Sequence, residues 1–166
     1  ISNASLFAAG PSVDANGNLT YTAAANANGT STFDVQVQDN GGTANGGDDT
    51  SQLQQFTITV NAVNDEPNFT ASDPPAVNED AGTQTVNSWA AFDPGPANES
   101  GQSVLAYTVS NISNAGLFAV APSVDASGNL TYTPAANANG TSTFDVQVQD
   151  NGGTANSGDD TSQLQQ

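Results

Sequence analysis

Short stretches of alternating apolar and polar residues recur along the chain and predict β-strands. The clearest is 141–149, where Phe144, Val146 and Val148 occupy every second position and polar residues lie between them. A period of two is typical of a strand with one buried face. The segment 151–153, Asn-Gly-Gly, then predicts a turn, because Asn and Gly tolerate the positive φ that tight turns require.

The same pattern predicts seven strands for one repeating unit. They cover residues 68–77, 83–92, 104–111, 117–124, 129–133 and 141–149, and the last begins near Ser162. The apolar half of that last strand is present only in the first copy, at 56–60, where Phe56, Ile58 and Val60 alternate with Thr. Apolar residues make up only 36% of the chain, yet their regular alternation favours a folded all-β sandwich over disorder.

The chain contains a long internal repeat. Residues 1–55 align without gaps to 112–166, and only six positions differ. A period of this length matches a whole sandwich domain better than a solenoid unit. We therefore expect 1–66 to be a partial repeat that ends in a linker, and 67–166 to be a nearly complete one. Two explanations stay open for the incomplete repeats: the sequence is a window on a longer chain, or identical subunits exchange strands in a filament.

The charge balance restricts the partners. The chain has 17 acidic residues and no Lys, Arg or His. No basic side chain is present to meet a phosphate, which argues against nucleic acid and anionic membranes as partners. No apolar run is long enough for membrane insertion. Nucleophilic triads need a base such as His or Lys, so we also expect no enzymatic activity.

Acidic clusters in such a chain favour a bound cation. Without cationic side chains, every carboxylate must be solvated, hydrogen-bonded or bound to a metal ion. Two carboxylates about 4 Å apart repel each other by roughly 1 kcal/mol in bulk water, and by several times more near a protein surface. Groups of carboxylates that the fold brings together are therefore candidate metal ligands.

Three segments together resemble a known family. They are 128–153 (GNLTYTPAANANGTSTFDVQVQDNGG), the linker 63–67 (VNDEP) and 77–86 (VNEDAGTQTV). In this order and spacing the chain resembles the bacterial cadherin-like, immunoglobulin-like tandem repeats of large surface adhesins and type I-secreted exoproteins. The resemblance implies a seven-strand Greek-key sandwich repeated in tandem, an extracellular or cell-surface location after secretion, and Ca²⁺ at the junctions between repeats.

In a seven-strand sandwich the incoming linker and alternate loops meet at one end of the domain. That end would collect acidic and amide side chains from four segments, namely Asn64, Asp65 and Glu66 of the linker, Asp93 and Glu99 after 83–92, Asp125 after 117–124, and Asp150, Asp159 and Asp160 after 141–149. Ca²⁺ takes six to eight oxygen ligands from carboxylates, carbonyls and Asn side chains. We predict a Ca²⁺ site at this end. The alternative is that these acids are ordinary solvated loop residues.

The resemblance also implies roles for single residues. Asn64 and Asp65 match the acidic linker motif, Asp93 matches the first Asp of a D-x-D motif whose second position is Gly95 here, and Asp150 and its copy Asp39 match the Asp that ends a strand. Glu79 matches a glutamate at the opposite end of the domain, which would bind the metal of the next junction.

These observations predict an extracellular structural spacer in the stalk of a bacterial adhesin or surface fibre, stiffened by Ca²⁺ and in contact with adjacent repeats of the same chain. Two other functions stay open. One is a module that binds a glycan or a protein through its loop tips. The other is a filament subunit that exchanges strands with identical chains through truncated sandwich edges.

Overall fold

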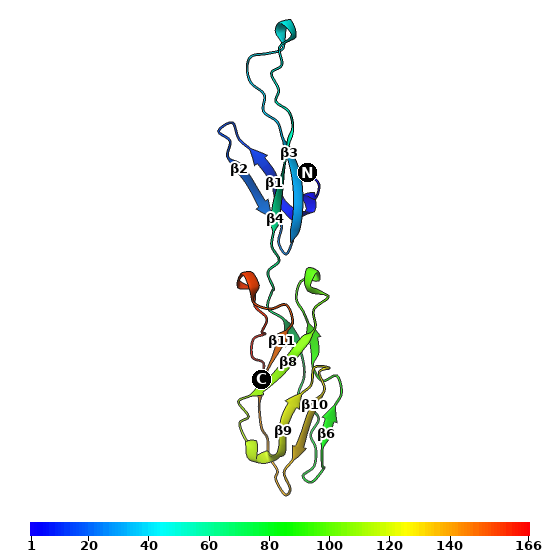
Figure 1. The fold of residues 1–166 in the computed structure, drawn as a ribbon. Helices are drawn as coiled ribbons and strands as arrows, with labels where there is room; N and C mark the ends of the chain where they lie inside the picture. Colours follow the sequence, from blue (N-terminus) through cyan, green and yellow to red (C-terminus); the bar gives the residue numbers. More distant parts are fainter. The chain divides into compact units, whose positions relative to one another are not determined.

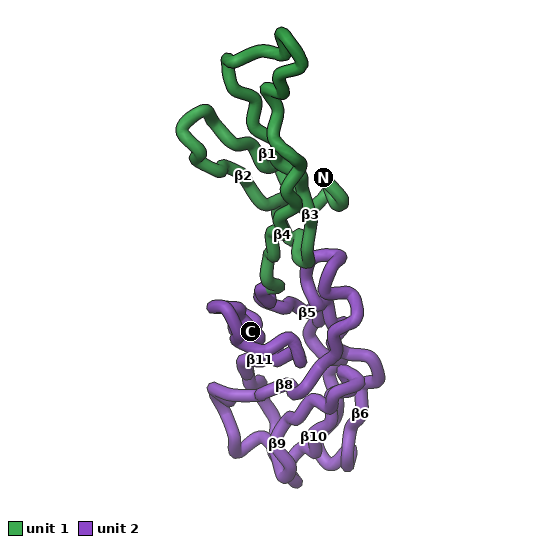
Figure 2. Tube along the Cα trace, turned by 45° about the horizontal axis from the view of Figure 1, so that its top comes forward, with its two compact units in different colours: residues 1–62 green, residues 63–166 purple.

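The computed structural model describes residues 1–166. It contains antiparallel β-strands and short 3-10 turns but no α-helix, which confirms the all-β prediction. None of its helical turns has the length and apolar character needed to span a membrane. The chain divides into two compact units, Ile1–Ala62 and Val63–Gln166 (Figure 2). The linker residues Asn64, Asp65 and Glu66 therefore lie in the second unit.

The first unit consists of two strand pairs (Figure 1). Its elements are η1 (Ala4–Leu6), β1 (Phe7–Val13), β2 (Leu19–Ala23), β3 (Gly29–Val35), η2 (Ala44–Gly46) and β4 (Gln54–Val60). β1 pairs with β2, and β3 pairs with β4, both antiparallel. The β3–β4 ladder runs without a break from Gly29 opposite Val60 to Val35 opposite Gln54. Few of its residues are buried; Leu6, Phe33 and Ile58 are the buried apolar ones.

The second unit is a larger assembly of three small antiparallel sheets. Its elements are β5 (Asn68–Thr70), β6 (Gln84–Val86), β7 (Ala91–Asp93), η3 (Ala97–Glu99), β8 (Val104–Ser110), η4 (Ala115–Leu117), β9 (Phe118–Val124), β10 (Leu130–Pro134), β11 (Asp145–Asp150) and η5 (Ala155–Ser157). The sheets have the strand orders β6-β10-β9, β11-β8 and β5-β7. This arrangement is consistent with the predicted immunoglobulin-like sandwich.

One apolar core holds the second unit together. It contains Phe69, Ala90, Tyr107, Val124, Leu130, Tyr132, Val146 and Val148, which come from all three sheets. Two edge-to-face aromatic pairs lie in or against it, Phe69 with Tyr107 at 5.5 Å and Phe118 with Tyr132 at 5.9 Å between ring centroids. Such pairs stabilise a core beyond the burial of their area.

Four predicted strands differ from the observed ones. The strand predicted to begin near Ser162 forms only two isolated bridges, Thr161 with Gln149 and Gln165 with Val146. The strand predicted at 68–77 ends at Thr70, and Pro74 and Pro75 follow, which cannot donate to a ladder. The strand predicted at 83–92 is split into β6 and β7, because Ser88 between them has a φ of 50°. The strand predicted at 141–149 begins only at Asp145. The same stretch in the first repeat forms β3, which begins at Gly29, the counterpart of Gly140. There it pairs with β4 along its whole length.

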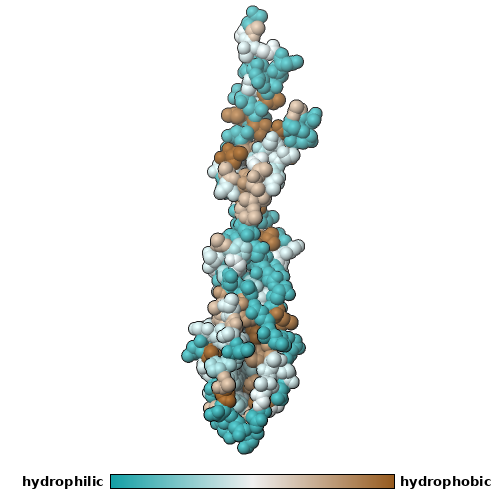
Figure 3. Space-filling model, turned by 180° about the vertical axis from the view of Figure 1, so that it is seen from behind, coloured by the Kyte–Doolittle hydropathy of each residue, from teal (hydrophilic) through white to brown (hydrophobic).

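The two near-identical copies differ sharply in burial. Leu130 is fully buried whereas its counterpart Leu19 is 43% exposed, and Val148 is fully buried whereas Val37 is 67% exposed. In the second unit, residues 67–111 supply core members such as Tyr107, which pack in one cluster with Leu130 and Val148. Hydrophobic residues accordingly reach the surface among hydrophilic ones (Figure 3).

This contrast gives a matched pair of substitutions. Leu130→Ala should lower the free energy of unfolding of the second unit by about 2–5 kcal/mol, because it removes a fully buried side chain and leaves a cavity. Leu19→Ala, in the same local sequence, should change stability by about 0.5 kcal/mol or less. Urea unfolding followed by circular dichroism measures both units, and the fluorescence of Trp89, the only tryptophan, reports on the second unit. Equal losses in the two variants would contradict the difference in packing.

Candidate functional site

The linker is held to the second unit through Asn64, which is buried. Its side-chain amide donates to Asp150 Oδ1 at 3.1 Å and to the carbonyl of Asp159 at 2.6 Å. Its side-chain oxygen accepts from Gln102 Nε2 at 2.5 Å. Its backbone carbonyl accepts from the N–H of Asp159 at 3.0 Å. Asn64 thereby joins the linker to the loop before β8 and to both sides of the loop after β11.

Asp150 is a fully buried carboxylate at the end of β11. Burial of an ionised carboxylate is costly unless hydrogen bonds compensate for the lost water. Asn64 supplies one donor, and the backbone N–H of Gly152 supplies a second at 2.9 Å from Oδ1. Since the chain has no cationic side chain, amide donors stabilise this carboxylate in place of a salt bridge.

Two glycines make room for Asn64. A Cβ atom on Gly152 would overlap the side-chain oxygen and carbon of Asn64. A Cβ on Gly158 would lie 2.8 Å from the backbone nitrogen of Asn64, closer than real Cβ contacts. The first copy keeps both glycines, as Gly41 and Gly47, but has no linker residue against them. The loop after β11 is therefore a socket for Asn64.

A second group of oxygen atoms surrounds Gly95. Glu99 is buried, and its Oε1 accepts from the backbone N–H of Asp65 at 2.8 Å. Its other oxygen, Oε2, is buried and has no hydrogen-bond partner. The position of a Cβ on Gly95 would be 3.2 Å from that oxygen, 3.8 Å from the carbonyl oxygen of Glu66 and 3.9 Å from Cβ of Asp65. The three residues thus converge on one place.

Of the eight predicted site residues, the second unit brings six to its linker end, in two groups. Asn64 and Asp150 form one group, and Asp65, Glu66 and Glu99 form the other; Asp93 lies beside the second, with Oδ1 accepting from the N–H of Gly95 at 3.1 Å.

The other two residues lie elsewhere. Asp39 is exposed in the first unit, where its Oδ1 accepts from the N–H of Gly41 at 2.7 Å. Glu79 lines a groove with residues 138–144 of the second unit. No three acidic side chains of the chain form a group that could hold a metal ion between them.

Asp125 belongs to the turn between β9 and β10 and not to the linker groups. Its carboxylate accepts from the N–H groups of Ser127 and Asn129, each at 2.9 Å, and from the side-chain amide of Asn129 at 2.9 Å. The hydrogen bonds from the Asn129 backbone and side chain lower the pKa of Asp125 from its ordinary value, because they favour the ionised form. This carboxylate therefore stabilises the turn between β9 and β10.

Sequence reasoning missed Gln102, Gly152 and Gly158 as members of the site. Gln102 lies in a polar loop and has no signature of its own. The sequence predicts only a turn at Gly152 and assigns no role to Gly158. Their presence in both copies at the same spacing was the available signal, but the partner that approaches them lies more than 80 positions away.

The comparisons with known proteins agree with this fold. The model of the family described as bacterial Ig domain matches the chain twice in tandem, over residues 2–61 and 64–161. The predicted resemblance to an immunoglobulin-like tandem repeat is thereby confirmed. No curated protein and no solved structure matches the chain significantly.

The socket yields a prediction with an internal control. Gly152→Ala should displace Asn64, because the new methyl group would overlap its side chain. The amide of Asp159, which donates to Asn64, should then exchange its hydrogen about tenfold faster or more, as expected for one lost hydrogen-bond anchor. Hydrogen exchange read by mass spectrometry or NMR measures this.

Gly41→Ala is the matched control, in the same local sequence. Its methyl group would meet only the movable carboxylate of Asp39, at 3.0 Å. Protection of Asp159 should be unchanged in this variant. Unchanged protection in Gly152→Ala as well would show that the linker does not depend on the socket.

Proposed function

This chain belongs to the bacterial Ig domain family, and on that premise we propose that it is a structural spacer in a bacterial cell-surface protein. Bacterial Ig domains are a non-catalytic, structural domain type and typically occur in extracellular and surface proteins. A spacer needs units that can be repeated in tandem, and connections that keep a fixed distance between neighbouring units. The near-identity of 1–55 and 112–166 supports the first requirement.

The observation that carries the proposal is the burial of Asn64. A flexible linker would have its polar groups in water, whereas Asn64 makes its hydrogen bonds inside the second unit. Only residues 61–63 separate the end of β4 from this buried residue. A connection of three residues leaves a linker little freedom compared with longer ones. The spacer would therefore be stiffened by the protein itself.

Ca²⁺ would add to this stiffness at the second group of oxygens. The donors there are oxygen only, which suits Ca²⁺. Glu99 is the observation that favours it, since an ionised oxygen that is buried without a partner is costly unless a cation lies beside it. We infer that Glu99 Oε2, the carboxylate of Asp65 and the carbonyl of Glu66 would hold the ion. Bound Ca²⁺ would supply the positive charge that no side chain of this chain provides.

The spacer proposal predicts a narrow distribution of distances across the linker. The chain has no cysteine, so Asn16→Cys and Ser127→Cys place one spin label in equivalent turns of the two units. Electron–electron double resonance should give one narrow distance peak in this background. Adding Gly152→Ala should broaden it, and adding Gly41→Ala should not. A broad distribution before either glycine is changed would contradict a stiff spacer.

The Ca²⁺ proposal predicts a shift in thermal unfolding. Ca²⁺ at about 100 times its dissociation constant should add about 2.7 kcal/mol to the stability of the second unit, because it binds only the folded state. That corresponds to a rise in Tm of about 10 °C for a unit of this size. Glu99→Gln should abolish the rise, since it removes the charge that the ion would meet.

Glu79→Gln is the control, because it removes the same charge from a residue outside this group. It should leave the rise intact. An equal Tm rise in Glu99→Gln and the parent chain would argue against this site, while leaving the spacer proposal to the distance measurement.

A further inference from the structure

The second unit has one flank that is built from the longest stretch of the chain without a charge. That stretch is 100–124, and it contains both β8 and β9. The two strands contact each other, but they belong to different sheets. β8 pairs only with β11, and β9 pairs only with β10, so each of them is the edge of its sheet. Natural sheets usually protect such edges with charged side chains or with Pro.

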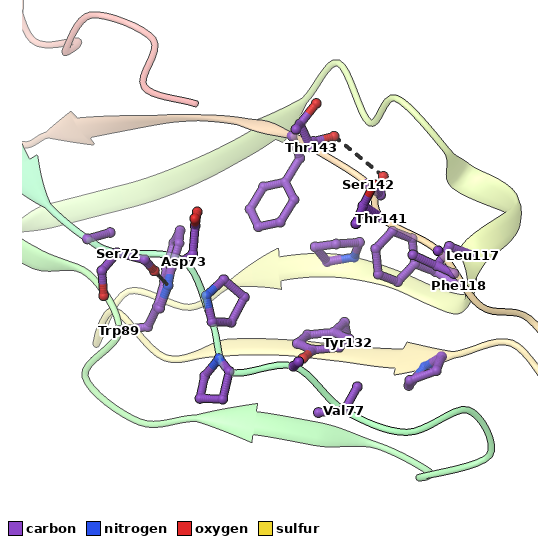
Figure 4. Close-up of a pocket in the computed structure, with 18 of the residues that line it drawn as sticks. Ser72, Asp73, Val77, Trp89, Leu117, Phe118, Tyr132, Thr141, Ser142 and Thr143 are labelled. Carbon is purple, nitrogen blue, oxygen red and sulfur yellow. Dashed lines mark hydrogen bonds between the residues drawn. The ribbon is translucent and has the colours of Figure 1, made fainter.

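The two edges differ in this protection. β9 carries Pro122, which has no N–H to donate to another strand. Its Phe118 packs inside the unit against Tyr132, as Figure 4 shows. β8 contains no Pro, no Gly and no charged residue, and more than half of its residues are β-branched or aromatic. β8 is therefore the unprotected edge of the flank.

The backbone of β8 has free hydrogen-bonding groups on the side away from β11. Val146 of β11 exchanges hydrogen bonds with Gln165, on the side of β11 that faces away from β8. Successive residues of a strand direct their N–H and C=O groups to opposite sides, so Gln147 faces β8, where it is opposite Thr108. By the same alternation, three residues of β8 direct their backbone groups to the free side, where no strand pairs with them: Leu105, Tyr107 and Val109.

The side chains of β8 hold the strand in place and leave its edge accessible. Tyr107 is buried in the core of the unit. Leu105 is 58% exposed, and Ala106 and Thr108 are exposed as well. A strand that is already ordered loses little conformational entropy when it pairs with another one. The free edge of β8 is thus a preformed site for one more strand.

The charge of the chain decides which partner suits this edge. A cationic partner would bind where the carboxylates are, and 100–124 has none. A partner that is itself acidic meets the least repulsion at an uncharged strand. With 17 acidic residues and no cationic side chain, a second copy of this chain is such a partner.

From these observations we propose that β8 pairs with β8 of a second copy, antiparallel and centred on Tyr107. Leu105 would be opposite Val109 of the second copy, and Tyr107 opposite Tyr107, so that each free N–H meets a free C=O. Both copies would contribute the same strand, as a two-fold interface requires. The sheet of β11 and β8 would continue from one copy into the other, which would join two spacers side by side.

Cross-linking tests the register of this pairing. Ala106 of one copy would be opposite Thr108 of the other in a non-hydrogen-bonded pair, with Cα atoms about 4.5 Å apart and within reach of a disulfide. The chain has no cysteine, so Ala106→Cys and Thr108→Cys each introduce a single thiol at an exposed position. Under mild oxidation, an equimolar mixture of the two variants should form the mixed disulfide.

Each cysteine variant alone is the control. Like positions of the two copies would be roughly 8 Å apart, which is too far for a disulfide, so each variant alone should cross-link about tenfold less than the mixture. No mixed disulfide, or as much cross-linking in either variant alone, would overturn the pairing.

Sedimentation velocity with a chelator present tests the association without any contribution from Ca²⁺. The parent chain should associate more as its concentration rises. An increase in NaCl from about 10 to 150 mM should strengthen the association, because it shortens the range of repulsion between the acidic copies from about 30 to about 8 Å. A parent chain that is monomeric at every concentration, or association that salt weakens, would overturn the proposal.

Two substitutions locate the interface in the same experiment. Leu105→Asp should weaken association about tenfold or more, because it places a charge within the paired strands. Leu164→Asp adds the same charge at a position that is 54% exposed and adjacent to Gln165, on the other side of β11, and it should associate like the parent. Equal weakening by both substitutions, or weakening by Leu164→Asp alone, would overturn the assignment to β8.

Discussion

The hydrogen bonds between Asn64 and Asp150 arise from a constraint that applies to the entire chain. No cationic side chain exists, so a carboxylate that is taken out of water must find amide donors or a metal ion. Asp150 is fully buried and receives amide donors from the linker and from Gly152. The linker is thus part of the second unit, because it satisfies a charge that the strand end would otherwise bury alone. Glu99 has one oxygen satisfied and one without a partner, which makes it the place where an external cation would contribute most.

The two copies separate the effect of local sequence from the effect of packing. Leu19 and Leu130 lie in the same sequence context and both belong to strands, β2 and β10. Only the second is buried, because 67–111 covers it. Strand extent also depends on the partner: β3 and β11 are copies of one stretch, yet β3 pairs with β4 and β11 pairs with β8. Alternation predicts that a stretch is extended, but the neighbouring strands decide which part of it joins a ladder.

Which predicted strands form therefore depends on regular alternation and on a neighbouring strand to pair with. The strand predicted at 104–111 corresponds to β8 at Val104–Ser110, because its alternation is regular and β11 pairs with it from end to end. The strand predicted at 68–77 is mostly absent, since Pro74 and Pro75 remove the donors that a ladder needs. The spacing of apolar residues alone does not reveal that these backbone donors are missing.

The candidate site was predictable in outline only. Loop order in a sandwich was enough to place Asp65, Glu99 and Asp150 at one end. Sequence could not show that Glu99 and Asp150 are buried, or that they lie in separate groups, because both depend on distances between segments far apart in the chain. The role of Gln102 depends entirely on its distance from Asn64 and has no counterpart in the local sequence.

The β3–β4 ladder has a consequence for the order of events during synthesis. Both of its strands leave the ribosome before residues 140–144 exist, and they are close in sequence, so their pairing is fast and free of competition. Refolding by dilution from denaturant at high concentration would differ from synthesis, because all strands are then available at once. β3 and its near-identical copy at 140–146 would then compete for β4. The state of the protein would depend on how it was made as well as on its sequence.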